Sequence, residues 1–277
     1  MQVEFKFLPS FSQNEKFTFD QPIYHMHIPK CGGTTIDHIF AKLSKILNIL
    51  KFERYTYIKN KKFFYNANKE NINPFITGHL NYNFAKNLDN VFKFTILRDP
   101  KERVISQYKF KVFLEKKIPS EYTFKEYISK EFSQRRDNLI TRHLTGLLGK
   151  KDNLSSQDKK IAIKNIKYFD SINIMDNWDF FVSDILTRFN LPSILYSRFQ
   201  QHNYDFTFVP SSQDLDIINK YYEYDNEIYS YVKSLVGKME INFNNKYNEK
   251  ICIVSPLMNN HSQIYTKEEI KKLFTKL

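Results

Sequence analysis

The chain has 277 residues, and 42% of them are hydrophobic, which is enough to bury a sizeable core in a single domain spanning residues 1–277. Only 6 glycines and 9 prolines occur, so the composition excludes a collagen-like chain and argues against a disordered one. The 42 basic and 30 acidic residues leave a net charge of +12. This charge favours an anionic partner, although a general lysine bias of the surface explains it at least as well.

The two cysteines, Cys31 and Cys252, are too few for a disulfide framework and favour a reducing compartment. No segment approaches the ~20 apolar residues of a membrane-spanning helix. The N-terminal stretch carries Glu4 and Lys6 and has no continuous apolar run, unlike a signal peptide. We therefore expect a cytoplasmic protein without integral membrane association.

Apolar runs at 23–28 and 91–97 predict buried strands, and shorter segments at 75–78 and 170–174 predict two more. The apolar residues from about Thr34 to Leu50 recur at three- and four-residue steps, which predicts a helix that Thr34 or Thr35 can cap. Further helices are expected from Pro100 onward and near 123–131, 137–148, 156–168, 176–189 and 212–236. Strands that alternate with helices indicate an α/β three-layer sandwich with a central, mostly parallel sheet flanked by helices.

The segment Pro29–Thr35 joins the first buried strand to the first helix and is rich in groups that bind anions. Gly32 and Gly33 let the backbone approach a ligand closely, and the start of the helix offers unpaired N–H groups. Lys30 adds a mobile charge, and two threonine hydroxyls follow the glycines. This P-loop-like arrangement predicts a phosphate cradle, although a tight structural turn also explains two glycines. Because Lys30 precedes the glycines, the segment is not a Walker A motif.

Cys31 lies inside this loop and has two interpretations. The helix N-terminus and the neighbouring Lys30 could lower the pKa of its thiol and make it a nucleophile. A loop cysteine without an evident partner base is more often a small filler residue, and we favour that interpretation.

A second strand-to-helix junction carries Arg98 at the carboxyl end of its strand and Ser106 two helical turns later. Arginine grips phosphate with a fork of donors, and the serine hydroxyl can complete the grip if the helix crosses the same crevice. The alternative is that Arg98 is paired with a carboxylate in a purely structural role.

In combination, HIPKCGGTT at 27–35 and LRDPKERVISQY at 97–108 closely resemble the PAPS-dependent sulfotransferases. PAPS is 3′-phosphoadenosine 5′-phosphosulfate. The resemblance is strongest to the carbohydrate branch that includes heparan sulfate 2-O-sulfotransferase and its bacterial relatives, and it covers about residues 22–235. It implies that the first motif holds the 5′-phosphosulfate and the second holds the 3′-phosphate. The donor-binding residues that it implies are Lys30, Cys31, Gly32, Gly33, Thr34, Thr35, Arg98 and Ser106.

The resemblance continues between and beyond these motifs. The segment FITGHLNYNFAK at 75–86 is similar to the family segment that carries a catalytic histidine, which would be His79. The segment DNLITRHLTG at 137–146 resembles a family pattern near the active site, and it implies substrate-binding roles for its polar residues Asn138, Thr141 and Arg142. No clean adenine-loop signature follows, and residues 240–277 lie outside the resemblance.

Sulfuryl transfer is an in-line displacement at sulfur, in which positioning and charge stabilisation dominate. Lys30 suits the neutralisation of the leaving oxygen, and a histidine near its ordinary pKa suits the removal of the acceptor proton. His79 is the expected base; His27 could face the cleft, although a structural role is favoured for it. No metal is needed, and the side chains near His25 and His27 do not form an evident metal site.

The expected acceptor is a hydroxyl of a carbohydrate, which could be acidic, because basic residues could line its cleft; a solvated basic face explains them equally well. These residues are Lys109, Lys111, Arg135, Arg136 and Arg142. Two alternatives stay open: a kinase with an unusual phosphate loop, and a nucleotide- or polyanion-binding module without turnover. Nucleic-acid binding rests on net charge alone, and no recognised module supports it.

Overall fold

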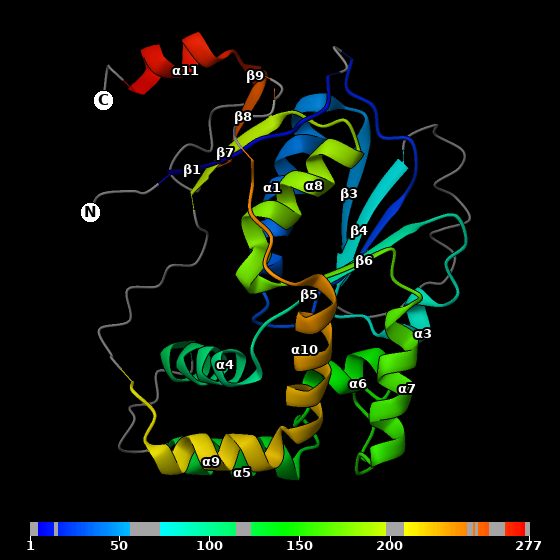
Figure 1. Ribbon diagram of the computed structural model, residues 1–277, viewed down its shortest axis with the longest axis vertical. Coiled ribbons are helices and arrows are strands. Elements are labelled where there is room, and N and C mark those ends of the chain that lie inside the picture. Colours follow the sequence, from blue (N-terminus) through cyan, green and yellow to red (C-terminus); the bar gives the residue numbers. More distant parts are fainter. Residues whose placement is uncertain are drawn as a thin grey trace.

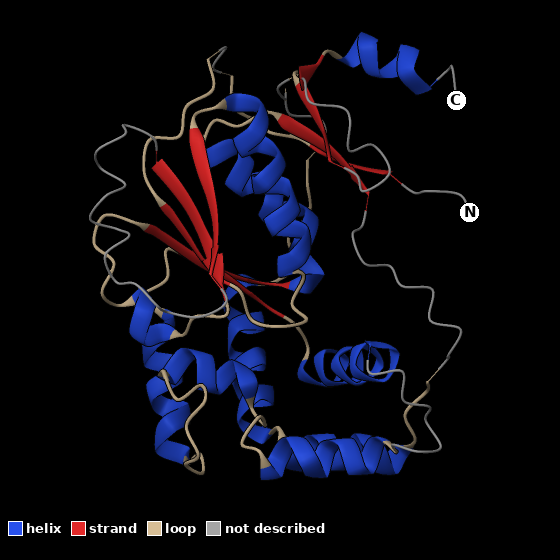
Figure 2. Ribbon diagram, turned by 180° about the vertical axis from the view of Figure 1, so that it is seen from behind, coloured by secondary structure: helices blue, strands red, loops and turns tan. Residues whose placement is uncertain are grey.

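The computed structural model describes residues 5–13, 16–55, 73–114, 123–197, 208–242, 246, 249–254 and 264–274. Its centre is a five-stranded sheet in the order β3-β4-β2-β5-β6, and all four neighbouring pairs are parallel (Figures 1 and 2). The strands are β2 (Ile23–Met26), β3 (Leu50–Tyr55), β4 (Asn73–Gly78), β5 (Phe92–Leu97) and β6 (Ser171–Ile174). A fully parallel sheet needs cover on both faces, which explains the nearly continuous apolar runs of its central strands.

The alternation of side chains along β2 separates two hydrophobic clusters. Ile23 packs into the cluster on one face of the sheet, whereas Tyr24 and Met26 pack into the cluster on the other. Successive residues of a strand point to opposite faces, so four buried residues in a row serve two layers at once.

Helices cover both faces of this sheet (Figure 1). The apolar stripes of α1 (Gly33–Leu47) and α8 (Trp178–Arg188) pack into the first cluster. The second cluster is covered by α6 (Leu139–Thr145), α7 (Ser156–Ile166) and α10 (Glu223–Val236), and the short α3 (Tyr82–Ala85) packs beside them. The expected three-layer α/β fold is therefore confirmed.

A third hydrophobic cluster forms where helices pack on each other rather than on the sheet. It joins α4 (Pro100–Leu114), α5 (Phe124–Ser133) and α9 (Ser212–Tyr221), with the buried ring of Tyr108 at an edge-on angle to Phe124. Because α4 begins at the end of β5, this cluster anchors the helix that carries Ser106.

A second, smaller sheet has the order β1-β7-β8-β9 and was not expected from the sequence. It consists of β1 (Phe5–Leu8), β7 (Ser193–Ser197), β8 (Ile251–Val254) and β9 (Ile264–Tyr265), and α11 (Lys267–Phe274) follows it. Its strands are short and pair over long sequence separations, mostly from segments without a clear apolar period, so local pattern does not reveal them.

Three expectations about boundaries are wrong. The first helix ends at Leu47, because Asn48 adopts a left-handed conformation there, and β3 begins at Leu50 in a stretch without a clear period. Gly32, not a threonine, is the N-cap of that helix. The expected helix over 212–236 is two helices that meet at Tyr222. Within the described residues, no helix combines the length and the apolar character needed to cross a membrane.

Candidate functional site

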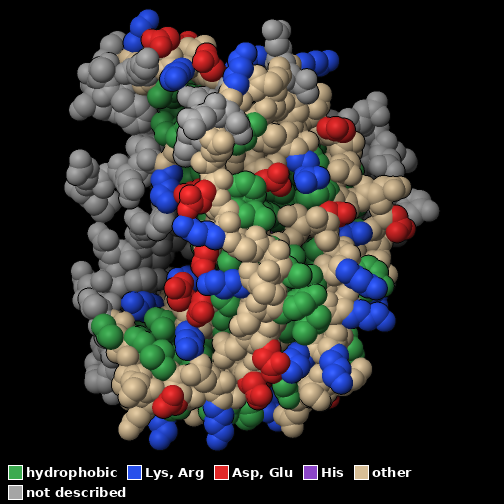
Figure 3. Space-filling view, viewed as in Figure 1, with side chains coloured by type: hydrophobic (Ala, Val, Ile, Leu, Met, Phe, Trp, Pro, Cys, Tyr) green, Lys and Arg blue, Asp and Glu red, His purple; other side chains and the backbone are tan. Residues whose placement is uncertain are grey.

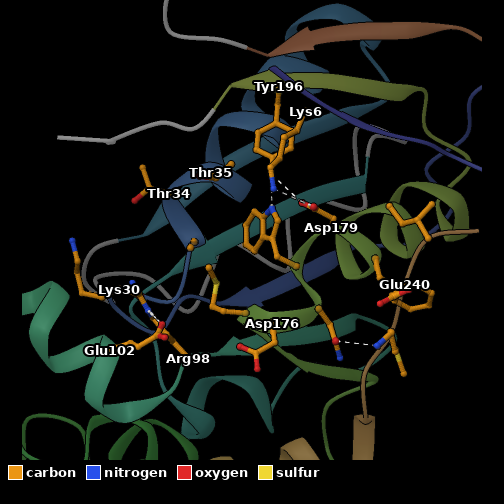
Figure 4. A pocket seen from close by; sticks show the side chains of 18 of the residues that line it. Lys6, Lys30, Thr34, Thr35, Arg98, Glu102, Asp176, Asp179, Tyr196 and Glu240 are labelled. Carbon is orange, nitrogen blue, oxygen red and sulfur yellow. Dashed lines mark hydrogen bonds and ion pairs between the residues drawn. The ribbon is translucent and has the colours of Figure 1, made fainter. Parts of the chain in front are cut away.

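A cavity of about 830 Å³ opens at the carboxyl ends of β2, β5 and β6. Parallel α/β sheets bind ligands at this edge, where the loops that follow the strands converge. The loop after β2 contributes Lys30 and Gly32–Thr35, the junction after β5 contributes Arg98 and Ser106, and the turn after β6 contributes Met175–Asp179. The two motifs that resemble the sulfotransferases therefore line one cavity (Figure 4).

The backbone of the loop after β2 has no room for side chains at its two glycines. Gly32 has a φ of 77°, and a Cβ there would lie 2.7 Å from the ring of Trp178. A Cβ on Gly33 would lie 2.2 Å from the ring of His27. Glycine is thus required at Gly32 by both conformation and space, and at Gly33 by space alone.

The N-terminus of α1 faces the cavity without a capping side chain. Its N-cap is Gly32, which makes no side-chain cap hydrogen bond, and both threonines of the first turn, Thr34 and Thr35, line the cavity. The first turn of a helix carries unpaired N–H groups and the positive end of the helix dipole. This end of α1 can therefore hold an anion of the phosphate type.

Lys30 adds a cation to this anion site. It has a φ of 68°, and its Nζ lies 4.2 Å from the centre of the Phe110 ring. Burial and the nearby positive charge of Arg98 lower the pKa of Lys30 to about 8. Among the described residues no carboxylate forms an ion pair with it, so an anionic ligand would be its natural counter-charge.

Arg98 lies beside the loop, at the end of β5. Its Nη1 donates a 3.4 Å hydrogen bond to the carbonyl of Lys30, and its Nε donates to Glu102 over 3.2 Å. Arg98 and Ser106 both line the cavity, and Glu102 lies between them on α4. The structure thus brings the expected arginine and serine together, and it also contains the carboxylate pair that was considered as the alternative. The two arrangements coexist because Glu102 engages Nε and the carbonyl of Lys30 engages only Nη1.

The opposite wall of the cavity is a hydrogen-bonded chain of side chains (Figure 4). The indole of Trp178 donates to the hydroxyl of Tyr196, which donates to Asp179, which forms an ion pair with Lys6. Trp178 also lies against Gly32, so this wall and the anion loop support each other.

A strap at 238–241 closes another side of the cavity. The amide of Asn177 ties it to the body of the protein, because it donates to the carbonyl of Gly237 and accepts from the N–H of Met239. Lys238 and Glu240 on the strap pair with each other. Acidic and basic side chains alternate on this face of the molecule, between α8 and α4 (Figure 3).

His79 lies beside His27 and is not among the residues that line the cavity. It directly follows β4, it is partly buried, and its Nδ1 donates a 2.8 Å hydrogen bond to the carbonyl of His27. A carbonyl only accepts, so Nδ1 carries the hydrogen and Nε2 keeps a lone pair. Burial and the neighbouring His27 lower the pKa of His79, which keeps it neutral near pH 7. Its ring lies 4.5 Å from the ring of His27, and His27 does line the cavity.

Asn138, Thr141 and Arg142 do not reach the cavity. All three are buried, and their polar groups bind other parts of the chain. Arg142 binds the carboxylate of Asp137 and two backbone carbonyls, and Thr141 donates to Asp225. The Asn138 amide binds the backbone of α9 and α10. Asn138 and Thr141 join α6 to α10, whereas Arg142 ties α6 to the segments before and after it. The sequence pattern could not distinguish these roles from substrate contact.

Cys31 turns away from the cavity into the second hydrophobic cluster. Its side chain is 2% exposed, and burial raises the pKa of the thiol to about 11. The structure therefore supports the interpretation of Cys31 as a filler residue, and it leaves the thiolate almost unpopulated at neutral pH. No group of three metal-binding side chains occurs in the part of the chain that the structure describes.

The sequence profile of the Sulfotransferase family matches residues 16–232. The chain belongs to the sulfotransferase family. The prediction of a PAPS-dependent sulfotransferase is confirmed at this level, whereas the narrower resemblance to the heparan sulfate branch stays a prediction.

Two solved sulfotransferase structures match this chain at low sequence identity. A sulfotransferase from Alicyclobacillus acidocaldarius is 11% identical, over 79% of this chain and 97% of its own, with a TM-score of 0.46. A mouse sulfotransferase complexed with PAP is 13% identical, over 83% of this chain and 70% of its own, with a TM-score of 0.32. A search of curated proteins finds no match. The family assignment therefore rests on the sequence profile.

The sequence did not single out the wall opposite the loop in this sulfotransferase. One signal could have found Trp178, which is the single tryptophan of the chain and follows the carboxyl end of a predicted strand. Tyr196 and the strap at 238–241 carry no comparable signal. They reach the cavity only through the pairing of the second sheet and through the amide of Asn177.

Thiol reactivity tests the burial of Cys31. With a pKa of about 11, about one thiol in a thousand is ionised at pH 8, so we expect no labelling by a disulfide reagent within minutes in the native protein. Cys252 is also buried, and its pKa is raised to about 12. The control is the same reaction in denaturant, which should titrate both thiols. Rapid labelling of native Cys252→Ser would contradict the burial of Cys31.

Proposed function

We propose that this sulfotransferase moves a sulfuryl group from PAPS to a hydroxyl of a carbohydrate, with Lys30 and His79 as catalytic residues. The observation that carries the proposal is the convergence of two anion-binding elements on one cavity. The uncapped start of α1 and the pair Arg98 and Ser106 line the same space. Two such elements suit a donor with phosphate groups at both its 5′ and 3′ positions.

The residues of the cavity fit this donor. Gly32 and Gly33 let the rings of Trp178 and His27 pack directly against the loop, and the N–H groups of the first turn of α1 suit the 5′-phosphosulfate. Arg98 and Ser106 suit the 3′-phosphate. The hydroxyls of Thr34 and Thr35 add donors near the loop. Cys31 contributes through its place in the loop and not through its buried thiol.

Lys30 is suited to the negative charge that develops on the leaving oxygen. Its pKa is lowered to about 8 by burial and by Arg98, and the approach of an anionic donor raises that pKa again and keeps the ammonium charged. Its side chain lines the cavity beside the anion loop. An ammonium that is partly desolvated before the reaction stabilises developing charge more than one in bulk water.

The order of the strands places Arg98, which is proposed to bind the 3′-phosphate of PAPS, and the proposed base His79 on different sides of β2. β4 lies on one side of β2 and β5 on the other, so His79 and Arg98 flank the loop from opposite sides. When the donor is bound, it supplies the sulfuryl group on a good leaving phosphate. His79 takes the proton of the acceptor hydroxyl at Nε2, because Nδ1 is already bound to the carbonyl of His27.

The proposed acceptor is a hydroxyl of a carbohydrate. The carbohydrate class rests on the motif resemblance, and the net charge of +12 is compatible with an acidic glycan. Arg142 is buried in an internal network, so we propose that it and its neighbours Asn138 and Thr141 maintain the fold instead of binding the acceptor.

His79→Ala tests the catalytic assignment. We expect turnover with sulfur-labelled PAPS and a panel of glycans to fall by at least ~100-fold, the usual scale of general-base catalysis. Binding of the product 3′,5′-bisphosphate (PAP) should stay close to that of the wild type, because His79 does not line the cavity. His38→Ala removes an exposed histidine of α1 and is the matched control. Turnover like the wild type in His79→Ala would remove His79 from the role. Tight PAP binding without label in any acceptor would favour a binding module.

Substitutions of Arg98 and of Glu102 should change the affinity for PAP in opposite directions. Arg98→Ala should weaken PAP binding by about 10- to 100-fold, the usual effect of losing hydrogen bonds to a charged group. Glu102→Gln should strengthen it, because a carboxylate that competes for Nε is removed. Calorimetric titration measures both.

The control for this test is Arg188→Ala, which breaks a similar pair with Asp184 on α8. It should leave the affinity for PAP unchanged. Unaltered affinity in Arg98→Ala would refute the phosphate assignment.

A further inference from the structure

A buried carboxylate lies directly behind the anion loop. Asp37 is on α1, one turn after Gly33, and its side chain is 5% exposed. Its Oδ1 accepts a 2.8 Å hydrogen bond from the hydroxyl of Thr77. Its Oδ2 lies 3.4 Å from Nδ1 of His27 and 3.4 Å from Nε of Arg54. One carboxylate thus joins the first helix to the carboxyl ends of β2, β3 and β4.

The directions of the hydrogen bonds around Asp37 determine which ring nitrogen of His25 carries the hydrogen. The hydroxyl of Thr77 donates to the carboxylate, so its oxygen accepts from Nδ1 of His25, which is 2.9 Å away. His25 therefore carries its hydrogen on Nδ1 and needs no charge. The second histidine, His27, presents its own Nδ1 to the other oxygen of the carboxylate at 3.4 Å, an ion-pair contact in which neither atom makes a hydrogen bond to any residue that the structure describes.

His27 connects this carboxylate to both the loop and the proposed base. Its Nε2 edge lies against Gly33, where a Cβ would be only 2.3 Å from Nε2. The centre of its ring lies 4.5 Å from the centre of the His79 ring, with the two rings tilted by 49°, and its carbonyl accepts a hydrogen bond from Nδ1 of His79. A rotation of the His27 ring would therefore disturb the loop and His79 together.

We propose that Asp37 is a positioning residue for sulfuryl transfer: it orients the His27 ring that supports His79, and its negative charge stabilises the imidazolium that His79 forms. This inference rests on the proposed function. In the step concerned, the acceptor oxygen forms a bond to sulfur, the bond from sulfur to the bridging phosphate oxygen breaks, and the acceptor proton goes to Nε2 of His79. The imidazolium is then the one new positive charge at this edge of the sheet.

The charged groups around His79 shift its pKa in opposite directions. Asp37 raises the pKa of His79, whereas burial, His27 and Arg54 lower it. Burial raises the pKa of Asp37 itself, but His25 and His27 lower it further, so it stays ionised at working pH. Asp37 and Arg54 are thus opposite charges of one network that act on the same histidine.

Two more histidines lie near this network, His38 beside Asp37 and Arg54, and His143 beside His79. His38, the next residue of α1, is exposed, and both burial and Arg54 lower its pKa. His143 on α6 is fully buried, and burial lowers its pKa to about 3, so it carries no charge during the reaction. Arg54 and Asp37 are therefore the fixed charges of this network.

A purely structural role for Asp37 makes a different prediction. If the carboxylate only ties α1 to β2 and β4, its loss lowers the midpoint of unfolding but leaves the titration of His79 unchanged. The pH dependence of turnover and the pKa of His79 distinguish the two roles.

The test compares Asp37→Asn and Arg54→Gln with the wild type at saturating PAPS. In Asp37→Asn we expect the rising limb of the pH profile of kcat to move to lower pH by about 0.5 to 1 unit, because a nearby negative charge is lost. The plateau of kcat should fall by about 10-fold. In Arg54→Gln the limb should move to higher pH by a similar amount, and PAP affinity should stay unchanged in both variants.

NMR titration of carbon-labelled histidine gives the pKa of His79 directly, and it should move in the same two directions. Asp225→Asn is the matched control, because it makes the same change in another buried carboxylate, which binds the start of α6. It should lower stability without moving the pKa of His79. A folded Asp37→Asn or Arg54→Gln with an unmoved His79 would overturn the inference.

Two further observations keep the test decisive. If Asp37→Asn does not fold, nitrogen NMR of the wild type must find the hydrogen of His27 on Nδ1, facing Asp37; a hydrogen on Nε2 would overturn the proposal. If no acceptor is sulfated, the proposed function fails, while the His79 titrations still report the network. If sulfation occurs and His79 does not respond, the inference alone fails.

Discussion

The close approach of the backbone at Gly32 and Gly33 is the constraint on which the rest of the site depends. Trp178 fills the space beside the first glycine and His27 fills the space beside the second. This contact holds the start of α1 at the carboxyl end of β2 and leaves no capping side chain on its first turn. A larger residue at either position would push the wall or the histidine away, and the anion-binding end of the helix would move with it.

Several charged side chains that line the cavity form ion pairs, whereas Lys30, the proposed catalytic cation, forms none with the described residues. Asp179 pairs with Lys6, Glu240 with Lys238, and Glu102 with Arg98. Lys30 instead lies over the ring of Phe110, with its pKa lowered to about 8 by burial and by Arg98. Within the described part of the chain, it is a cation at the loop without a carboxylate partner. A ligand that brings negative charge to the loop therefore offsets both the cost of burying the charge of Lys30 and the repulsion between Lys30 and Arg98.

The sequence was enough to predict four strands of the central sheet, the longer helices around it and the residues of both anion elements, because each depends on a local pattern: apolar periodicity, paired glycines, or a charged residue at a strand end. It missed β3, which lies in a stretch without a clear apolar period. It could not predict the wall formed by Trp178 and Tyr196, because this wall depends on β7 pairing with segments far away in sequence. It also could not separate Thr141 and Arg142 from substrate contacts, since a buried network and an active site use the same polar residues. Asp37 was missed for a related reason: a carboxylate inside a helix shows its partners only after folding.

The central claim is that one cavity is built for a ligand with two separate phosphate groups. The most direct test is a calorimetric comparison of PAP with ATP and with adenosine 5′-monophosphate. The account predicts that PAP binds more tightly than either by at least about 10-fold, since only PAP places a second phosphate within reach of Arg98. ATP binding as tightly as PAP would contradict the account and favour a nucleoside-triphosphate enzyme.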